Sequence, residues 1–222
     1  MTAEEETKIS QIKTFVTQVL KDDETGHDMT HIERVLTMTQ HILKTEPTAD
    51  AFVAQSAALL HDTYDDKLFV DTDLAKAHVV KMLTDIAVPA TQQADIFNII
   101  DNMSWSKQRF GNPAPLSLAG KIVQDADRLD AIGAIAIARA IQYGVAHGDA
   151  LYDPKMPPRQ VTTKAAYRKG EGNTIINHFY EKLFLLKNYL NTDEGKRVGA
   201  KRDSIMHDFV AQFEAEWQQT DY

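Results

Sequence analysis

Apolar residues recur at helical spacing along almost the whole chain, and this pattern limits the fold more than any other feature. No stretch has the alternation typical of a strand, so the pattern predicts an all-α fold. A helix that contains Ile32 and Leu43 is expected to stop before Pro47. The other predicted helices cover about 4–21, 48–62, 72–86, 90–103, 117–142, 174–190 and 194–218.

Length, charge and cysteine content restrict the classes of protein to which the chain can belong. A chain of 222 residues is long enough to bury a substantial core as one domain. Its formal net charge of −8 argues against binding to duplex nucleic acid or an anionic membrane surface. The sequence has no cysteine, so a metal must be held by His and carboxylate side chains. The polar start MTAEEETKIS and the lack of a long apolar run predict a cytoplasmic protein with no membrane segment.

Metal-capable side chains occur in three apolar helical settings. They are His27 and His31 in GHDMTHIERV, the pair His61-Asp62 in ALLHDTYDD, and Asp125, Asp127 and Asp130 in QDADRLD. A single histidine beside a core is more often structural, and an aspartate at a helix start is usually a cap. The adjacent His61-Asp62 pair is harder to explain by packing, because a buried carboxylate must be paired or metal-bound. Imidazole and carboxylate ligands suit one divalent ion, namely Mn²⁺, Fe²⁺, Ni²⁺, Zn²⁺, Co²⁺ or Mg²⁺.

The order His31, His61-Asp62, Asp127 resembles the H…HD…D signature of the HD-domain phosphohydrolase superfamily. Members of that family are all-α, metal-dependent enzymes that act on phosphate esters and anhydrides. The segments HIERV, AALLHD and DADRLDAIGAIAIAR agree with this resemblance, which covers about 25–140. It implies that these four residues are the metal ligands, with Mn²⁺ as the favoured ion. Asp125 would then be a cap or a partner of the ligands, and His27 a rival of His31 or a contact to substrate or a second metal.

The C-terminal segment, from NHFYEKL to EAEW, resembles the last helices of one bacterial branch of this family. That branch includes HD-type nucleoside-triphosphate pyrophosphohydrolases. The resemblance implies one HD-type helical domain over 1–222, with the metal-site core at about 25–140 and a loop and C-terminal helices at about 144–222. It also implies hydrolysis of nucleoside triphosphates to monophosphate and pyrophosphate. A homodimer is compatible with the sequence, which has no pattern that fixes the oligomeric state.

Two further readings of the function stay open. The first is a nucleoside monophosphate phosphatase or a hydrolase of a signalling nucleotide such as guanosine tetraphosphate, with the same metal site. The second is a metal-bound nucleotide sensor without turnover, although a sensor has no need of the extra acids Asp65 and Asp66.

Asp65 and Asp66 follow Asp62 by three and four residues, one turn along if the helix continues. The simplest explanation of the two acids is a solvated C-terminal end of a helix. The helix dipole makes negative charge at that end unfavourable, however. HDTYDD is also similar to the HDTxED of the HD-type hydrolases of guanosine tetraphosphate, which implies that the two acids help activate water. Asp66 is expected nearest the water and Asp65 second. Arg34, one turn after His31, is either a surface ion-pair residue or the partner of a buried acid.

A basic segment between residues 155 and 169 is the main candidate for binding the phosphates of a substrate. It contains five basic residues and no acid: Lys155, Arg159, Lys164, Arg168 and Lys169. It is either a solvated loop or a mobile loop in which Lys164 and Arg168 close over a polyphosphate while Tyr167 stacks on a base. The entrance to the same substrate site is expected to be lined by Lys67, Trp105, Lys107 and Arg109.

Overall fold

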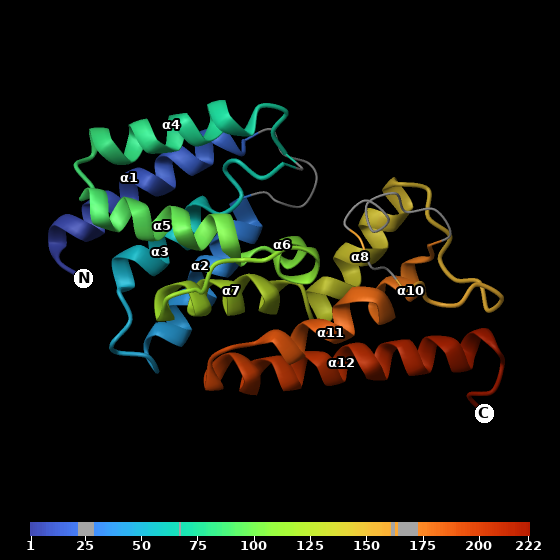
Figure 1. Ribbon diagram of the computed structural model, residues 1–222. Coiled ribbons are helices and arrows are strands. Elements are labelled where there is room, and N and C mark those ends of the chain that lie inside the picture. The colour runs from blue at the N-terminus through green and yellow to red at the C-terminus, as the bar shows by residue number, and fades with distance from the viewer. Residues whose placement is uncertain (22–28, 67, 161–162, 164–172) are drawn as a thin grey trace. The chain divides into compact units, whose positions relative to one another are not determined.

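The computed structural model describes residues 1–21, 29–66, 68–160, 163 and 173–222, and the regular elements among them are helices (Figure 1). The one bridge between extended residues in this part of the chain joins Ala150 and Thr174. The predicted all-α class is therefore confirmed. The chain divides into two compact units, Met1–Asp127 and Arg128–Tyr222, which are described separately. The single-domain organisation stays a prediction.

The first unit is arranged around one short helix. Its elements are α1 (Ala3–Val19), α2 (Met29–Leu43), α3 (Ala51–Leu60), α4 (Thr72–Asp85), α5 (Ala90–Met103), α6 (Trp105–Phe110) and α7 (Leu118–Asp130), which runs three residues beyond the unit. Helix α3 packs against α1, α2 and α5, while α4 lies beside α1 and α5 (Figure 1). The central place of α3 explains why its sequence is apolar on most sides.

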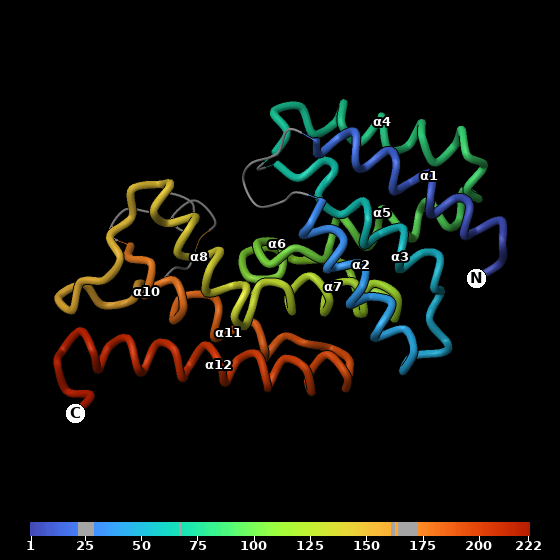
Figure 2. The backbone as a smooth tube through the Cα atoms, turned by 180° about the vertical axis from the view of Figure 1, so that it is seen from behind, coloured from blue at the N-terminus to red at the C-terminus, as the bar shows by residue number. Residues whose placement is uncertain are grey.

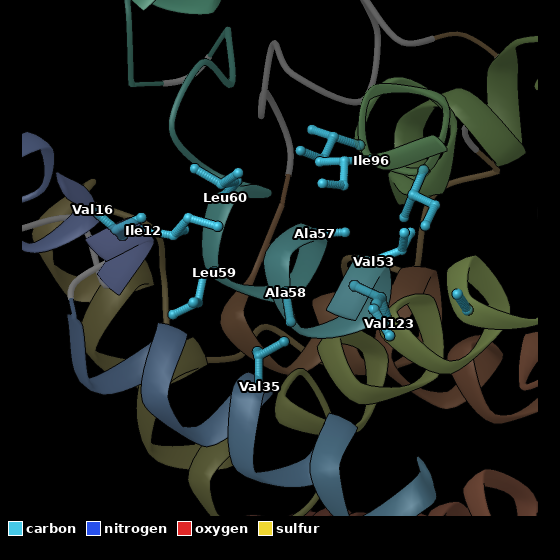
Figure 3. Close-up of a cluster of buried hydrophobic side chains, with 14 of the residues drawn as sticks. Ile12, Val16, Val35, Val53, Ala57, Ala58, Leu59, Leu60, Ile96 and Val123 are labelled. Carbon is cyan, nitrogen blue, oxygen red and sulfur yellow. The ribbon is translucent and has the colours of Figure 1, made fainter. Parts of the chain in front are cut away.

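The core of the first unit surrounds α3. All nine residues from Phe52 to Leu60 are buried. Ile12, Val35 and Ile96, from α1, α2 and α5, belong to the same apolar cluster (Figure 3). Fully burying a side chain of this size contributes about 1.5–3 kcal/mol. The end of α3, where the His-Asp pair follows, is therefore fixed by packing on three sides.

The second unit combines two long helices with one helical run of mixed type. Its elements are α8 (Ala134–Ala146), α10 (Ile175–His178), the π-helical η1 (Phe179–Leu183), α11 (Phe184–Leu186), the 3-10 helix η2 (Lys187–Tyr189) and α12 (Asp193–Trp217). Helix α12 packs against α8, α11 and η2, and α10 packs against α8 (Figure 2). Among the described residues no single helix has the length and apolar composition to cross a membrane, although the bent pair α7–α8 meets that test jointly.

Three boundaries differ from the sequence-based expectations. The helix expected over 117–142 is two helices, because Gly133 has φ 92° and ψ −162°, a conformation open essentially to glycine alone. Helix α3 ends at Leu60, so Asp65 and Asp66 lie in the following turn instead of on a helix face. The loop after α5 contains α6, whose N-cap Ser104 accepts a hydrogen bond from the Lys107 amide at 3.2 Å.

Candidate metal centre

Three helices of the first unit bring two imidazoles and two carboxylates together. His31 lies on the buried stripe of α2 that also contains Ile32 and Val35, so its ring points into the core. His61 is the C-cap of α3 and Asp62 is the next residue. Asp127 lies in the last turn of α7. The His31, His61 and Asp62 side chains are 3–6 % exposed, whereas that of Asp127 is 32 % exposed.

The reactive atoms of these four residues converge within a few ångströms. The Nε2 atoms of His31 and His61 are 3.2 Å apart. Asp62 Oδ2 lies 3.6 Å from the first nitrogen and 3.4 Å from the second. Asp127 Oδ1 lies 3.6 Å and 3.8 Å from the same two atoms. Both histidines therefore direct one ring nitrogen each to a point that two carboxylates share.

A backbone contact sets the tautomer of His61. Its Nδ1 lies 2.9 Å from the Ala58 carbonyl oxygen, an acceptor, so Nδ1 carries the proton that is donated and the neutral ring presents a lone pair at Nε2. Burial lowers the pKa of His61. The pKa is raised by the charges of Asp62 and Asp127, by the hydrogen bond to the Ala58 carbonyl and by the charge of Asp65. Together these effects are larger than that of burial, so the pKa lies above its ordinary value. Protons and a metal ion would therefore compete for Nε2.

The donor set fits a divalent metal ion. Nitrogen and oxygen ligands at about 2.0–2.2 Å from one ion lie roughly 3.0–3.5 Å from one another, close to the separations seen here. One nitrogen or oxygen atom each from His31, His61 and Asp127 lies within 4.8 Å of the others. With neutral imidazoles the two carboxylates supply a charge of −2, which a divalent cation balances. The exposed face of Asp127 leaves the site open toward solvent, as a catalytic metal requires.

The turn after the His-Asp pair carries the two extra acids. Asp65 is half-buried and its charge raises the pKa of His61, whereas Asp66 is exposed. Between the two pairs lies Tyr64, whose hydroxyl donates a hydrogen bond to Asp101 Oδ1 at 3.1 Å. Burial and the Asp101 carboxylate raise the pKa of Tyr64 above its usual range, so its hydroxyl stays a donor. These observations favour Asp65 as the acid closer to the four ligands.

The remaining predicted residues lie in varied places. Arg34 is half-buried on α2 and its Nη1 donates to Thr30 Oγ1 at 3.3 Å. Asp125 is fully buried. Trp105, Lys107 and Arg109 lie on α6, where Trp105 is half-buried and the two basic residues are exposed. Six of the predicted residues lie outside the described residues, namely His27, Lys67, Lys164, Tyr167, Arg168 and Lys169.

Arg159, in the basic segment, forms an ion pair inside the second unit. Its backbone amide, Nε and Nη2 all donate to Glu181, with N–O distances of 2.7–3.2 Å. The Glu181 side chain is only 1 % exposed. The charge of Arg159 is therefore balanced by a residue of η1. A cavity of about 260 Å³ nearby is lined by Met156, Tyr180 and Glu214, among others, and by none of the predicted site residues.

The sequence reasoning missed a polar network around Tyr64. Lys76 Nζ lies 2.5 Å from Asp101 Oδ2 and 5.2 Å from the centroids of both the Tyr64 and Phe97 rings. These residues come from the turn after α3, from α4 and from α5. The one signal in the sequence was an aromatic residue between the His61-Asp62 pair and the two extra acids, and it does not reveal a partner 37 residues away.

Comparisons with known proteins agree with the fold. The family model of the HD domain matches residues 29–132. The protein YpgQ of Bacillus subtilis is 36 % identical over 204 residues, which cover 92 % of this chain and 91 % of YpgQ. It has been solved in complex with ADP, with a TM-score of 0.76, 34 % identity and 96 % of each chain covered.

Two further solved structures extend this likeness. A protein of Lactobacillus plantarum has a TM-score of 0.85 at 44 % identity, with 96 % of this chain and 98 % of that chain covered. An HD-superfamily hydrolase of Bacillus thuringiensis has a TM-score of 0.76 at 36 % identity, with the same coverage. The fold and the His-Asp cluster define an all-helical metallohydrolase. The chain belongs to the HD superfamily and is a metal-dependent phosphohydrolase.

Proposed function

We propose that this protein hydrolyses nucleoside triphosphates to nucleoside monophosphates and pyrophosphate at a single divalent-metal site. The observation that carries the proposal is the convergence of His31 Nε2 and His61 Nε2 with the carboxylates of Asp62 and Asp127. The ADP complex of YpgQ supports a nucleotide as the substrate class. The proposal includes Mn²⁺ as the favoured ion, a cytoplasmic location and a homodimer.

Each ligand residue has a defined task in this proposal. His31, His61, Asp62 and Asp127 would hold the ion, and the Ala58 carbonyl keeps His61 in the tautomer that binds it. A bound divalent ion would polarise a phosphoryl oxygen and lower the pKa of a coordinated water. The carboxylates also balance the ionic charge, and burial of three of the four side chains fixes their positions.

The acid turn would supply proton transfer. Water attacks the α-phosphorus, the bond between that phosphorus and the bridging oxygen breaks, and pyrophosphate leaves. Asp65, in place of the expected Asp66, would accept the proton of the attacking water, because it is half-buried and its charge raises the pKa of His61. Asp66 is exposed and would serve as the second acid. Arg34, half-buried on α2, would hold an acid near the site.

Cations outside the metal site would neutralise the triphosphate. Lys107 and Arg109 are exposed on α6 of the first unit and would approach the phosphates. Lys67, Lys164 and Arg168 would do the same, with Tyr167 against the base and His27 as a further contact. Arg159 is excluded from this group because Glu181 already holds its guanidinium.

The test is a product assay on a nucleotide panel. The purified protein is incubated with tri-, di- and monophosphates of each base and with guanosine tetraphosphate, in Mn²⁺, Co²⁺, Ni²⁺ or Mg²⁺, and the products are separated by ion-exchange chromatography. We expect equal amounts of monophosphate and pyrophosphate from triphosphates. Free phosphate from monophosphates, or pyrophosphate from guanosine tetraphosphate alone, would overturn the proposal. Tight nucleotide binding without turnover would identify a sensor.

A further inference from the structure

Tyr64 lies at the centre of the only stretch that carries both a ligand pair and the acid pair, with His61-Asp62 before it and Asp65-Asp66 after it. Its side chain reaches residues of α4 and α5. The phenol hydroxyl donates to Asp101 Oδ1 at 3.1 Å, and the second oxygen of Asp101 accepts from Lys76 Nζ at 2.5 Å. A turn that follows α3 is thus joined to two other helices by one side chain.

The ring of Tyr64 adds a second type of contact to this network. Lys76 Nζ lies 5.2 Å from the centroids of both the Tyr64 and the Phe97 rings, within the range of a cation–π interaction. The two rings are 6.3 Å apart and tilted by 47°. The ammonium group therefore meets one carboxylate and two aromatic faces. Each partner restricts the rotation of the others.

Backbone hydrogen bonds hold the turn on both sides of Tyr64. The Thr63 amide and hydroxyl both donate to the Leu60 carbonyl, at 3.0 Å and 2.7 Å. The Asp65 amide reaches the Asp62 carbonyl at 3.4 Å, near the limit of a hydrogen bond, whereas the Asp65 carbonyl accepts from the amides of Leu68 and Phe69, both at 3.0 Å. Asp65 directly follows Tyr64, so the orientation of its side chain depends on where the Tyr64 side chain is held.

We propose that Tyr64 is a positioning residue, which acts through Asp101 and Lys76 to hold Asp65 in the orientation needed for proton transfer. The inference rests on the proposed hydrolytic function and assigns a role to three residues outside the ligand set. Loss of one hydrogen bond to a charged group changes an equilibrium by about 10- to 100-fold, and only part of this effect reaches Asp65 through the backbone. The expected effect falls on catalytic turnover because His61 and Asp62 are held separately by the core and by Ala58.

The experiment compares Tyr64→Phe, Asp101→Asn and the double variant with the wild-type protein. Tyr64→Phe keeps the ring and removes only the donor. We expect kcat for the best triphosphate to fall about 3- to 10-fold in each single variant, with KM and Mn²⁺ affinity nearly unchanged. The double variant should be no slower than the worse single variant, because both changes act on the same bond: Tyr64→Phe removes the donor, and Asp101→Asn leaves only a neutral, weaker acceptor.

Lys81→Met is the matched control. Lys81 forms an exposed ion pair with Asp85 at 2.6 Å on the same helix α4, whereas the Tyr64 hydroxyl bonds to Asp101. Its kcat should equal that of the wild type. Full kcat in Tyr64→Phe would overturn the inference, and so would a loss of Mn²⁺ affinity as large as the loss of kcat.

Hydrogen exchange separates this inference from the proposed function. Amide exchange of the segment 61–66 is measured without nucleotide in all four variants. Faster exchange in Tyr64→Phe and Asp101→Asn, and not in Lys81→Met, is expected from loss of the tether. If the wild type cleaves no nucleotide but this exchange pattern is seen, the proposed function fails and the positioning of the turn stands. Unchanged exchange in Tyr64→Phe overturns the positioning role whatever the activity.

Discussion

Asp62 and Asp65 are three residues apart but differ in their surroundings. Substitutions at the two positions are therefore expected to affect metal binding and catalysis differently. The Asp62 side chain is 6 % exposed and lies within 3.6 Å of both histidine Nε2 atoms, whereas Asp65 is half-buried in the turn. We expect Asp62→Ala to lower Mn²⁺ affinity by more than about 100-fold and to abolish hydrolysis. Asp65→Asn should keep the metal and lower kcat by about 100-fold or more.

Asp66→Asn is the matched control for Asp65→Asn, because it makes the same chemical change at an exposed neighbour. Mn²⁺ binding is measured by titration calorimetry and kcat by pyrophosphate release. A larger loss of rate in Asp66→Asn than in Asp65→Asn would reverse the order of the two acids. Full rate in both variants would remove the pair from the mechanism.

The candidate ligands could be read from the sequence, but their partners could not. His31, His61, Asp62 and Asp127 stand in segments whose apolar context and order are unusual, and the structure brings them together. The Ala58 carbonyl contact depends on how α3 ends, and the Tyr64–Asp101 bond joins residues that are 37 positions apart. Such contacts follow from tertiary packing, which local spacing does not encode. The assignments of individual catalytic and binding residues stay predictions.

At the scale of elements, the break between α7 and α8 depends on one glycine. Gly133 has φ 92° and ψ −162°, and an added Cβ would come within 3.0 Å of the Arg202 Cβ. We expect Gly133→Ala to lower the free energy of unfolding by about 1–3 kcal/mol. Thermal unfolding followed by circular dichroism would measure this loss.

Gly148 provides the control for this substitution. It also has a positive φ, 77°, but a Cβ there would meet no atom within 4 Å. Gly148→Ala should cost less than Gly133→Ala, since backbone strain is its only penalty. Equal melting temperatures of Gly133→Ala and the wild type would contradict this account of the helix break.

Most helices could be predicted from apolar spacing, and the exceptions have physical causes. Helix α5 was predicted with its observed bounds, 90–103, because buried Ile96, Ile99 and Met103 mark one face. The region 117–142 is apolar on both sides of Gly133, so hydrophobic spacing alone continues across the break. Helix α6 has no buried residue, and therefore no apolar face from which it could be recognised.

At the scale of the whole molecule, acid stability should depend on a histidine of the second unit. Burial, followed by the positive charges of Lys182 and Arg159, lowers the pKa of His178 to about 3. The unfolded chain takes up a proton near the ordinary pKa of about 6.5. Below that pH the unfolded state binds more protons than the folded state, so stability falls as the pH falls toward 3. It is fully regained above pH 6.5.

His178→Gln should remove this part of the acid sensitivity, because glutamine has no charge to gain. Between pH 7.5 and pH 5 the wild type should lose about 1–2 kcal/mol more than the variant, a difference of several degrees in melting temperature. His41→Gln, at an exposed position on α2, is the control and should follow the wild type. Both proteins are compared at the same Mn²⁺ concentration, so the titration of the metal site affects them equally. Parallel curves of melting temperature against pH for His178→Gln and the wild type would contradict this prediction. They would show that folding does not lower the pKa of His178 and that acid destabilises the molecule through other groups.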